Sequence, residues 1–265
     1  MAIEIFNRYE NKYLVDADTL PRLQSRLSDC MELDAYNKKF DTYPISNLYY
    51  DTDDSHLIRT SLSKPSYKEK LRLRAYGVPD GESKVYVEIK KKFKGLVNKR
   101  RSAMKLGEAY GFLGGGSPEF QPYMNRQVLN EVACMLERSA LSPALYLAYD
   151  RRAYFGEGQH DLRVSFDTNI RTRRCHLRLE DGGYCEKLLG GGLWIMEVKV
   201  AQSIPIWLCR LLSEYKISPI SFSKYGTEYK QRLSENRSVA IQCLTPFSRS
   251  REPIRQSLSP AYSAL

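Results

Sequence analysis

Apolar and polar residues alternate along much of the chain, and this period of two predicts extended strands. A first strand is expected at 3–15. Four consecutive strands, separated by short polar or glycine-containing turns, are expected at 47–52, 66–77, 84–92 and 96–106. A second group is expected at 144–155, 162–170, 174–180 and 192–200. The first run of four indicates an antiparallel meander.

Apolar residues spaced three and four positions apart predict three helices, at 17–27, 126–138 and 204–216. The first places Leu20, Leu23 and Leu27 on one face. The last thirty residues or so are rich in Ser, Arg and Pro and lack apolar periodicity. The sequence therefore predicts a folded domain over 1–233 and a disordered tail over 234–265.

The polar faces of the expected strands carry mostly Lys and Arg. In 84–92 the apolar face holds Val85, Val87 and Ile89, and the other face holds Lys84, Glu88, Lys90 and Lys92. One such strand would normally turn its polar face to solvent. About eight of them together predict a closed barrel with a charged lumen and an apolar exterior covered by helices. Such a lumen suits an extended polyanion.

The segment KEKLRLR gives the clearest case. Alternate side chains of a strand leave the same face, so Lys68, Lys70, Arg72 and Arg74 form one row. Close like charges repel by about 1 kcal/mol per pair even in water. Negative groups are therefore expected opposite this row.

Composition narrows the possible partners. The 265 residues carry 41 Lys and Arg against 31 Asp and Glu, a net charge of +10, which favours anionic partners. Six cysteines without a CxxC pair indicate neither a zinc cage nor a disulfide framework, and a reducing cytoplasm is expected. No signal-like or membrane-spanning apolar run is present, so membrane contact is expected only through a partner.

The chain lacks the sequence motifs of several enzyme classes. The chain has no GxxxxGK[ST] loop and no GxSxG, and its three histidines are scattered. Phosphoryl transfer needs instead Arg and Lys around the phosphates and a metal held by carboxylate. Glu10, Glu88 and Glu197 lie amid basic strand faces, where each is a salt-bridge spacer or a metal ligand. The metal interpretation is preferred for Glu197, and the spacer interpretation for Glu10 and Glu88.

Nine motifs in order resemble the VTC domain, the polyphosphate polymerase domain of the vacuolar transporter chaperone family, within the triphosphate tunnel (CYTH-like) superfamily. They are RYENKY, NLYYDT, YKEKLRLRAYG, VYVEIKKK, VNKRR, YDRRAYF, LRVSFDT, IMEVKV and FSKYGTEY. The resemblance covers about 4–232. It implies an α+β fold, an eight-stranded antiparallel β-barrel with flanking helices, in agreement with the polarity pattern.

The resemblance also implies a set of site residues. The implied catalytic residues are Lys12, Arg72, Arg74, Lys90, Arg151, Arg163 and Lys224. Lys99, Arg101 and Lys199 are implied for substrate binding, the basic row adds Lys70, and Glu197 is the implied metal ligand. Arg152 is an alternative to Arg151. Arg8 stands where the superfamily's ExExK pattern has its first Glu, which favours a polymerase over a hydrolase.

The function expected from these residues is a Mn²⁺- or Mg²⁺-dependent phosphotransferase. It would transfer the terminal phosphoryl group of ATP to polyphosphate inside the tunnel, in the cytoplasm or at a membrane through a partner protein. Two alternatives stay open: a triphosphatase or short-chain polyphosphatase of the same fold, and a non-catalytic polyphosphate-binding module. Nucleic-acid binding is disfavoured because the charges lie on alternating, buried-looking faces and base-stacking aromatics are not obvious.

Overall fold

The computed structural model describes residues 5–156, 158–182 and 185–244. The chain divides into two compact units, Met1–Tyr229 and Lys230–Leu265, and the first contains the sheet. Eight long strands build that sheet: β1 (Ile5–Asp16), β3 (Tyr43–Asp51), β4 (Tyr67–Tyr76), β5 (Lys84–Phe93), β6 (Leu96–Lys105), β7 (Ser142–Gly156), β8 (Gln159–Arg173) and β10 (Leu193–Val200). Three short strands add to its edges: β2 (Met31–Leu33), β9 (Glu186–Lys187) and β11 (Pro219–Ile220).

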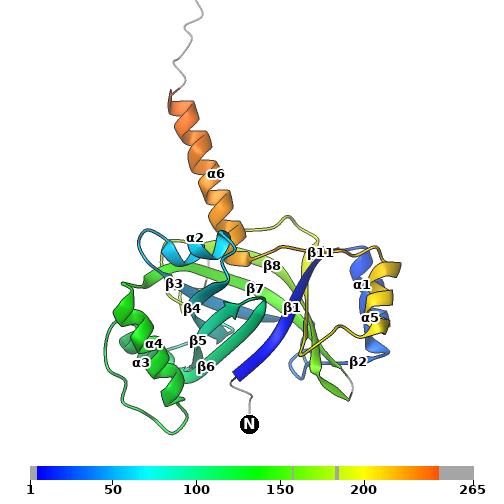
Figure 1. The fold of residues 1–265 in the computed structure, drawn as a ribbon, viewed down its shortest axis with the longest axis horizontal. Coiled ribbons are helices and arrows are strands. Elements are labelled where there is room, and N and C mark those ends of the chain that lie inside the picture. The colour runs from blue at the N-terminus through cyan, green and yellow to red at the C-terminus, as the bar shows by residue number, and fades with distance from the viewer. Residues whose placement is uncertain (1–4, 157, 183–184, 245–265) are drawn as a thin grey trace, which may run out of the picture. The chain divides into compact units, whose positions relative to one another are not determined.

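The eight long strands pair in a ring. Their order is β7-β3-β4-β5-β6-β1-β10-β8, every neighbouring pair is antiparallel, and β8 pairs back with β7. Figure 1 shows the strands curling around a common interior. The predicted eight-stranded antiparallel barrel is therefore confirmed, and its inner face is called the lumen below.

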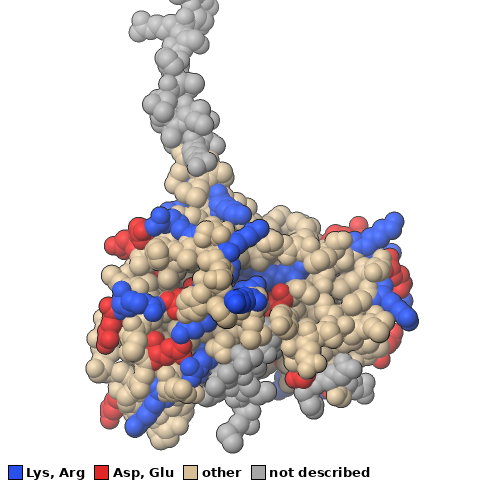
Figure 2. Space-filling view, in the orientation of Figure 1, with Lys and Arg blue, Asp and Glu red and all other residues tan. Residues whose placement is uncertain are grey.

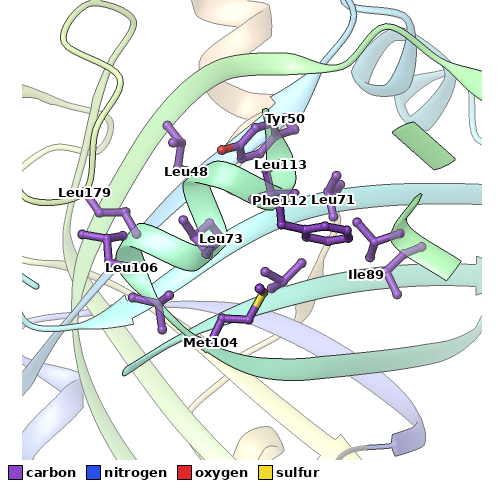
Figure 3. Packing of buried hydrophobic residues seen from close by; sticks show 14 of the residues in the cluster. Leu48, Tyr50, Leu71, Leu73, Ile89, Met104, Leu106, Phe112, Leu113 and Leu179 are labelled. Carbon is purple, nitrogen blue, oxygen red and sulfur yellow. The ribbon is translucent and has the colours of Figure 1, made fainter. Parts of the chain in front are cut away.

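The helices are α1 (Thr19–Ser28), α2 (His56–Leu62), α3 (Leu106–Leu113), α4 (Arg126–Arg138), α5 (Ile206–Glu214) and α6 (Lys224–Leu244). The outer face of the ring is covered by α1, α3, α4 and α5, whereas α2 and the first turn of α6 pack with residues of the inner face. Leu71, Leu73 and Ile89 project outward from β4 and β5 and pack against Phe112 and Leu113 of α3, as Figure 3 shows. On the other side, the leucines of α1 and α5 pack on β1, β8 and β10. The apolar faces predicted for the strands are thus the outward ones.

The inner face is not charged all the way round. The stretch built by β3 and β7 carries Tyr49, Leu147 and Tyr149, which pack with Ile58 of α2 and Tyr225 of α6. Most of the charged side chains lie on the remainder of the ring, from β4 through β5, β6, β1 and β10 to β8, together with Arg151 of β7. A polyanion would therefore meet cations on one side and tyrosine rings on the other.

Three sequence predictions differ from the structure. The expected strand at 174–180 is wrong, because the chain bends after Arg173 and His176 adopts a positive φ of 47°. The Arg173 guanidinium accounts for this bend, since its Nε and Nη2 donate to the carbonyls of His176 (2.9 Å) and Arg178 (2.7 Å). These carbonyls face an arginine instead of a neighbouring strand.

The helices α2 and α3 were not expected, because α2 is short and α3 contains two glycines. The segment 234–244, expected to be disordered, belongs to α6, which has no Pro or Gly after Gly226 to interrupt it. The remainder of the expected tail, 245–265, lies outside the described residues.

Candidate functional site

The row on β4 faces the lumen, as the alternation predicted. Arg72 pairs across the sheet with Glu88 of β5, and Lys70 pairs with Lys90. Lys90 in turn pairs with Lys99 of β6. Figure 2 shows Lys and Arg side chains gathered near the middle of the drawn face, with acidic side chains beside them. Three adjacent strands therefore present their basic residues to the same interior.

Glu88 binds three of these cations. Its carboxylate accepts from Arg72 Nε (2.8 Å) and from Lys99 Nζ (2.9 Å), and Arg74 Nε lies 3.7 Å away. The Glu88 side chain is 0% exposed. Burial alone would raise the pKa of Glu88, but Arg74, Lys99 and Arg72 hold it well below its usual value. Glu88 is thus a charged structural anchor, as the spacer interpretation predicted.

Asp167 forms a second anchor, which the sequence analysis missed. Arg151 Nε and Nη2 donate to its two carboxylate oxygens at 2.7 and 2.9 Å, and Lys224 Nζ lies 2.5 Å from Oδ2. Two-point contacts of this kind fix the plane of a guanidinium group. Arg152 points elsewhere and pairs with the exposed Asp41, so Arg151 is the arginine that faces the lumen.

Two further carboxylates lie on the neighbouring strands β1 and β10. Glu197 pairs with Lys199 at 2.9 Å, and Glu10 pairs with Lys90 at 2.6 Å. Glu10 stands opposite Lys199 across the sheet, so the two glutamates are diagonal neighbours. Burial would raise the pKa of Glu197, but Lys199, Lys12, Lys90 and Lys224 hold it well below its usual value. Both glutamates are therefore ionised and surrounded by cations.

Three lysines have no carboxylate partner among the side chains that the structure describes. Lys12 Nζ donates to the Phe222 carbonyl (2.9 Å), Lys68 Nζ to the Ser61 carbonyl (2.9 Å) and Lys70 Nζ to Ser223 Oγ (3.3 Å). Burial lowers the pKa of all three, and that of Lys70 to about 7. Neighbouring lysines add to this effect at Lys68 and Lys70, whereas Glu197, opposite Lys12 across the sheet, works against it at Lys12. This part of the lumen carries positive charge that the protein itself does not neutralise.

The last two predicted residues lie near tyrosines. The Arg101 guanidinium lies 4.5 Å from the ring centre of Tyr86. Arg163 Nη2 lies 3.2 Å from Asp34 and 3.4 Å from the hydroxyl of Tyr43. Arg163 Nε is buried and has no hydrogen-bond partner among the described residues. Every residue predicted for the site thus faces the lumen, although the roles assigned to them stay predictions.

The segment Phe222–Tyr229 brings Lys224 into the lumen. Tyr225 donates its hydroxyl to the buried Asp51 (2.8 Å), and Arg174 makes two 2.6 Å contacts with Glu228. A Cβ on Gly226 would lie 3.0 Å from Leu62, so glycine permits the close approach of α6 to α2. These contacts fix the start of α6 and with it the position of the Lys224 amine.

The acidic residues limit how a metal could bind. No group of three His, Cys, Asp or Glu side chains in the described part of the chain is arranged to hold an ion. Mg²⁺ is commonly held by one or two carboxylates together with substrate phosphates and water. Glu197 and Glu10 fit that pattern, because both are ionised and lie on adjacent strands of the lumen. They do not form an all-protein cage.

The comparison with protein families agrees with this geometry. The model of the VTC domain matches residues 7–233. The chain belongs to the VTC domain family. The matched range includes the ring of strands, apart from the first two residues of β1, and Lys224, so the resemblance inferred from the nine motifs is confirmed.

One relative that matches this VTC domain is distant in sequence. Vacuolar transporter chaperone complex subunit 4 of Trypanosoma brucei brucei is 24% identical over 208 residues, which covers 63% of this chain and 26% of that protein. The chain therefore spans about a quarter of that relative's length.

Two solved structures resemble the fold. One is described as a "putative adenylate cyclase" from Bacillus halodurans, with 16% identity, a TM-score of 0.52 and coverage of 83% of this chain and 96% of the other. Another, with the same description, is from Vibrio parahaemolyticus, at 14% identity and a TM-score of 0.42, covering 86% and 98%. Only the first has a TM-score above 0.5, and it supports the fold but says nothing about function.

None of the helices in the described residues combines the length and the apolar character that a membrane crossing requires.

Proposed function

We propose that this VTC domain is a metal-dependent polyphosphate polymerase that transfers the terminal phosphoryl group of ATP to a polyphosphate chain in the lumen. The observation that carries the proposal is the uncompensated charge of Lys68 and Lys70, which only other cations surround. Placing half-buried lysines side by side without carboxylates costs free energy, and the lowered pKa values of Lys68 and Lys70 reflect that cost. A phosphate chain would supply the missing negative charge along the strands.

The proposed step needs no general base. A terminal oxygen of polyphosphate, already ionised, bonds to the γ-phosphorus of ATP while the bond from that phosphorus to the β–γ bridging oxygen breaks. ADP leaves with the electron pair of the broken bond, and the polyphosphate chain is one phosphate longer. The protein must hold two polyanions in line and suppress their repulsion.

The lumen residues have different proposed roles in this step. Arg72, Arg74, Arg151 and Lys224 have their positions set by Glu88 and Asp167, so they would contact the phosphates with little reorganisation. The other cations proposed to contact substrate are Lys12, Lys70, Lys90, Lys99, Arg101, Arg163 and Lys199. Glu197, with Glu10 beside it, would hold Mn²⁺ or Mg²⁺, which neutralises charge on the nucleotide phosphates when bound. Association with a membrane through a partner protein is likewise a proposal.

A non-catalytic polyphosphate-binding module is the second candidate. The lack of a three-carboxylate cluster in the described residues favours it, because binding a polyanion needs only the basic residues. The two candidates differ in what Glu197 does. In the polymerase Glu197 serves turnover, whereas in the binder it only offsets the charge of Lys199.

The test is Glu197→Gln, with Glu131→Gln as a matched control. Glu131 also pairs with two cations, Lys91 and Arg100, but on the outer face of the sheet. We expect Glu197→Gln to lower Mn²⁺-dependent ATP turnover by roughly 100-fold or more, since a metal contributes several kcal/mol to charge stabilisation. Polyphosphate binding without metal should stay intact or tighten.

Normal turnover in Glu197→Gln would refute the assigned role. A wild-type protein that binds polyphosphate but shows no metal-dependent turnover would favour the binding module. Thermal unfolding of each variant separates a loss of fold from a loss of chemistry. If Glu197→Gln unfolds readily, Glu197 is a structural counter-charge, and Glu10→Gln becomes the variant that tests the metal site.

A further inference from the structure

Four tyrosine rings gather at one end of the lumen. Tyr36 lies 5.4 Å from Tyr43 and 6.2 Å from Tyr76, measured between ring centres, and its ring is within 3° of parallel to that of Tyr76. Tyr76 also contacts Tyr43 at 6.2 Å and the edge of Tyr86 at 6.0 Å. These residues come from three strands and from the segment after β2, so the fold assembles the tyrosine cluster from separate parts of the chain.

The tyrosine cluster continues the basic rows of the lumen. Tyr76 follows Arg74 by two residues on β4 and therefore lies on the same face, roughly 7 Å farther along the strand. Tyr86 stands directly opposite Arg74, and Tyr43 directly opposite Arg151. A ligand that extends past the arginines toward this end would contact the tyrosine rings where it leaves the lumen.

Two arginines join the tyrosine cluster to the phosphate-binding region proposed above. Arg101 stacks on Tyr86, and Arg163 reaches the hydroxyl of Tyr43 while its buried Nε has no partner among the described residues. Guanidinium groups that border the cluster, next to the exposed rings of Tyr36 and Tyr76, suit a ligand that is anionic at one end and flat at the other. Nucleotides have both properties.

Packing alone does not account for the exposed rings. Tyr36 is 58% exposed and Tyr76 is 42% exposed, although both touch other rings. Their hydroxyls make no hydrogen bond to another described residue. Tyrosines that served only to close the barrel would bury their faces, as Tyr154 does at 1% exposure against the outer helices.

From this geometry we infer that the tyrosine cluster is a nucleobase-binding subsite, on which the base of a nucleoside triphosphate stacks against Tyr76 and Tyr36. The inference rests on the proposed use of ATP. The triphosphate would extend from the tyrosine cluster toward Arg74, Arg151 and Arg163. The polyphosphate acceptor would then occupy the opposite end, where Lys68 and Lys70 lie.

The test compares two ligands that differ by the nucleoside. Binding of the non-hydrolysable ATP analogue with an imido β–γ bridge and of inorganic triphosphate is measured by titration calorimetry with the full chain and Mg²⁺. Stacking of one base contributes about 1–3 kcal/mol, a factor of roughly 5 to 150 in affinity. We expect Tyr76→Ala to weaken binding of the analogue by such a factor and to leave binding of triphosphate within about twofold.

Two matched variants sharpen the result. Tyr76→Phe keeps the ring and should bind the analogue as the wild type does. Phe93→Ala removes a 55% exposed ring at the other end of β5 and should change neither ligand.

The possible outcomes distinguish the nucleobase subsite from the proposed use of ATP. Equal binding of the analogue by wild type and Tyr76→Ala would overturn the nucleobase subsite alone. Equal weakening of both ligands in Tyr76→Ala would overturn it too, because the ring would then support the fold. A wild-type protein that binds triphosphate but not the analogue would overturn both the subsite and the proposed use of ATP.

Discussion

Arg72 and Lys70 stand two residues apart on one face of β4, yet the protein holds them in different ways. Arg72 binds the fully buried Glu88, whereas Lys70 has a serine hydroxyl at 3.3 Å and the ring of Tyr225 at 5.8 Å, but no carboxylate among the described side chains. The same contrast divides the lumen. One region is built around the carboxylates Glu88 and Asp167, and the other around lysines without carboxylate partners among the described side chains.

The difference separates two tasks. A buried carboxylate fixes the direction of its arginines before any ligand arrives, which favours in-line chemistry. A lysine without a carboxylate stays electrostatically unsatisfied, so it gains most when an anion enters. We therefore expect changes at Glu88 to act mainly on folding and changes at Lys70 to act mainly on ligand and proton binding.

The largest expected effect is on folding stability. Glu88→Gln removes the charge that three cations share, and uncompensated buried charges typically cost about 3–5 kcal/mol. Urea denaturation should show a loss of that size. The control Glu82→Gln breaks a pair with Lys105 in which Glu82 is 82% exposed, and about 0–1 kcal/mol is expected. A Glu88→Gln variant as stable as the control would remove the distinction between the two regions.

A smaller effect is expected from pH. Burial lowers the pKa of Lys70 to about 7 from an ordinary value of 10.5, so between these pH values the unfolded chain binds the proton and the folded chain does not. The free energy of unfolding should therefore rise between pH 7 and pH 9 without ligand.

Denaturation curves measured across this pH range compare the slope of the wild type with that of a variant that lacks the Lys70 amine. Lys70→Met removes one titrating group, so it should reduce the slope and raise the stability at pH 7. The rest of the slope should remain, because burial also lowers the pKa values of Lys99 and Lys199 to about 7. A wild-type stability that falls over this range would contradict the assignment of uncompensated charge.

The smallest expected effect is the proton uptake that accompanies ligand binding. A polyanion near Lys70 raises the pKa of its amine, so binding at pH 8 should take up a fraction of a proton. Titration calorimetry in two buffers with different ionisation enthalpies measures this number. The uptake should shrink in Lys70→Met. Binding without uptake in the wild type would mean that the ligand does not approach this lysine.

Much of the fold follows from local patterns. The period of two predicted the long strands, and the spacing of apolar residues predicted α1, α4 and α5, because the burial of one face leaves a periodic pattern in the sequence. The helix α3 was missed because Gly107 and Gly111 lower its intrinsic propensity, and packing of Phe112 on the sheet compensates. The strand expected at 174–180 was wrong because a single guanidinium organises that bend.

The site was predicted less completely. The basic row on β4 could be predicted because its residues lie on one strand. Asp167 as a partner of Arg151 depends on register between two strands, and the tyrosine cluster depends on residues from four segments. Contacts between distant segments are set by the closed ring and not by any local pattern.

The central claim is that the lumen catalyses transfer from ATP to polyphosphate. The most direct measurement is incubation of the purified protein with ATP labelled at the γ-phosphate and Mn²⁺, followed by gel electrophoresis of the products. We predict a ladder of labelled chains that grows with time together with ADP. Release of labelled orthophosphate without a ladder, or no turnover at all, would contradict the account.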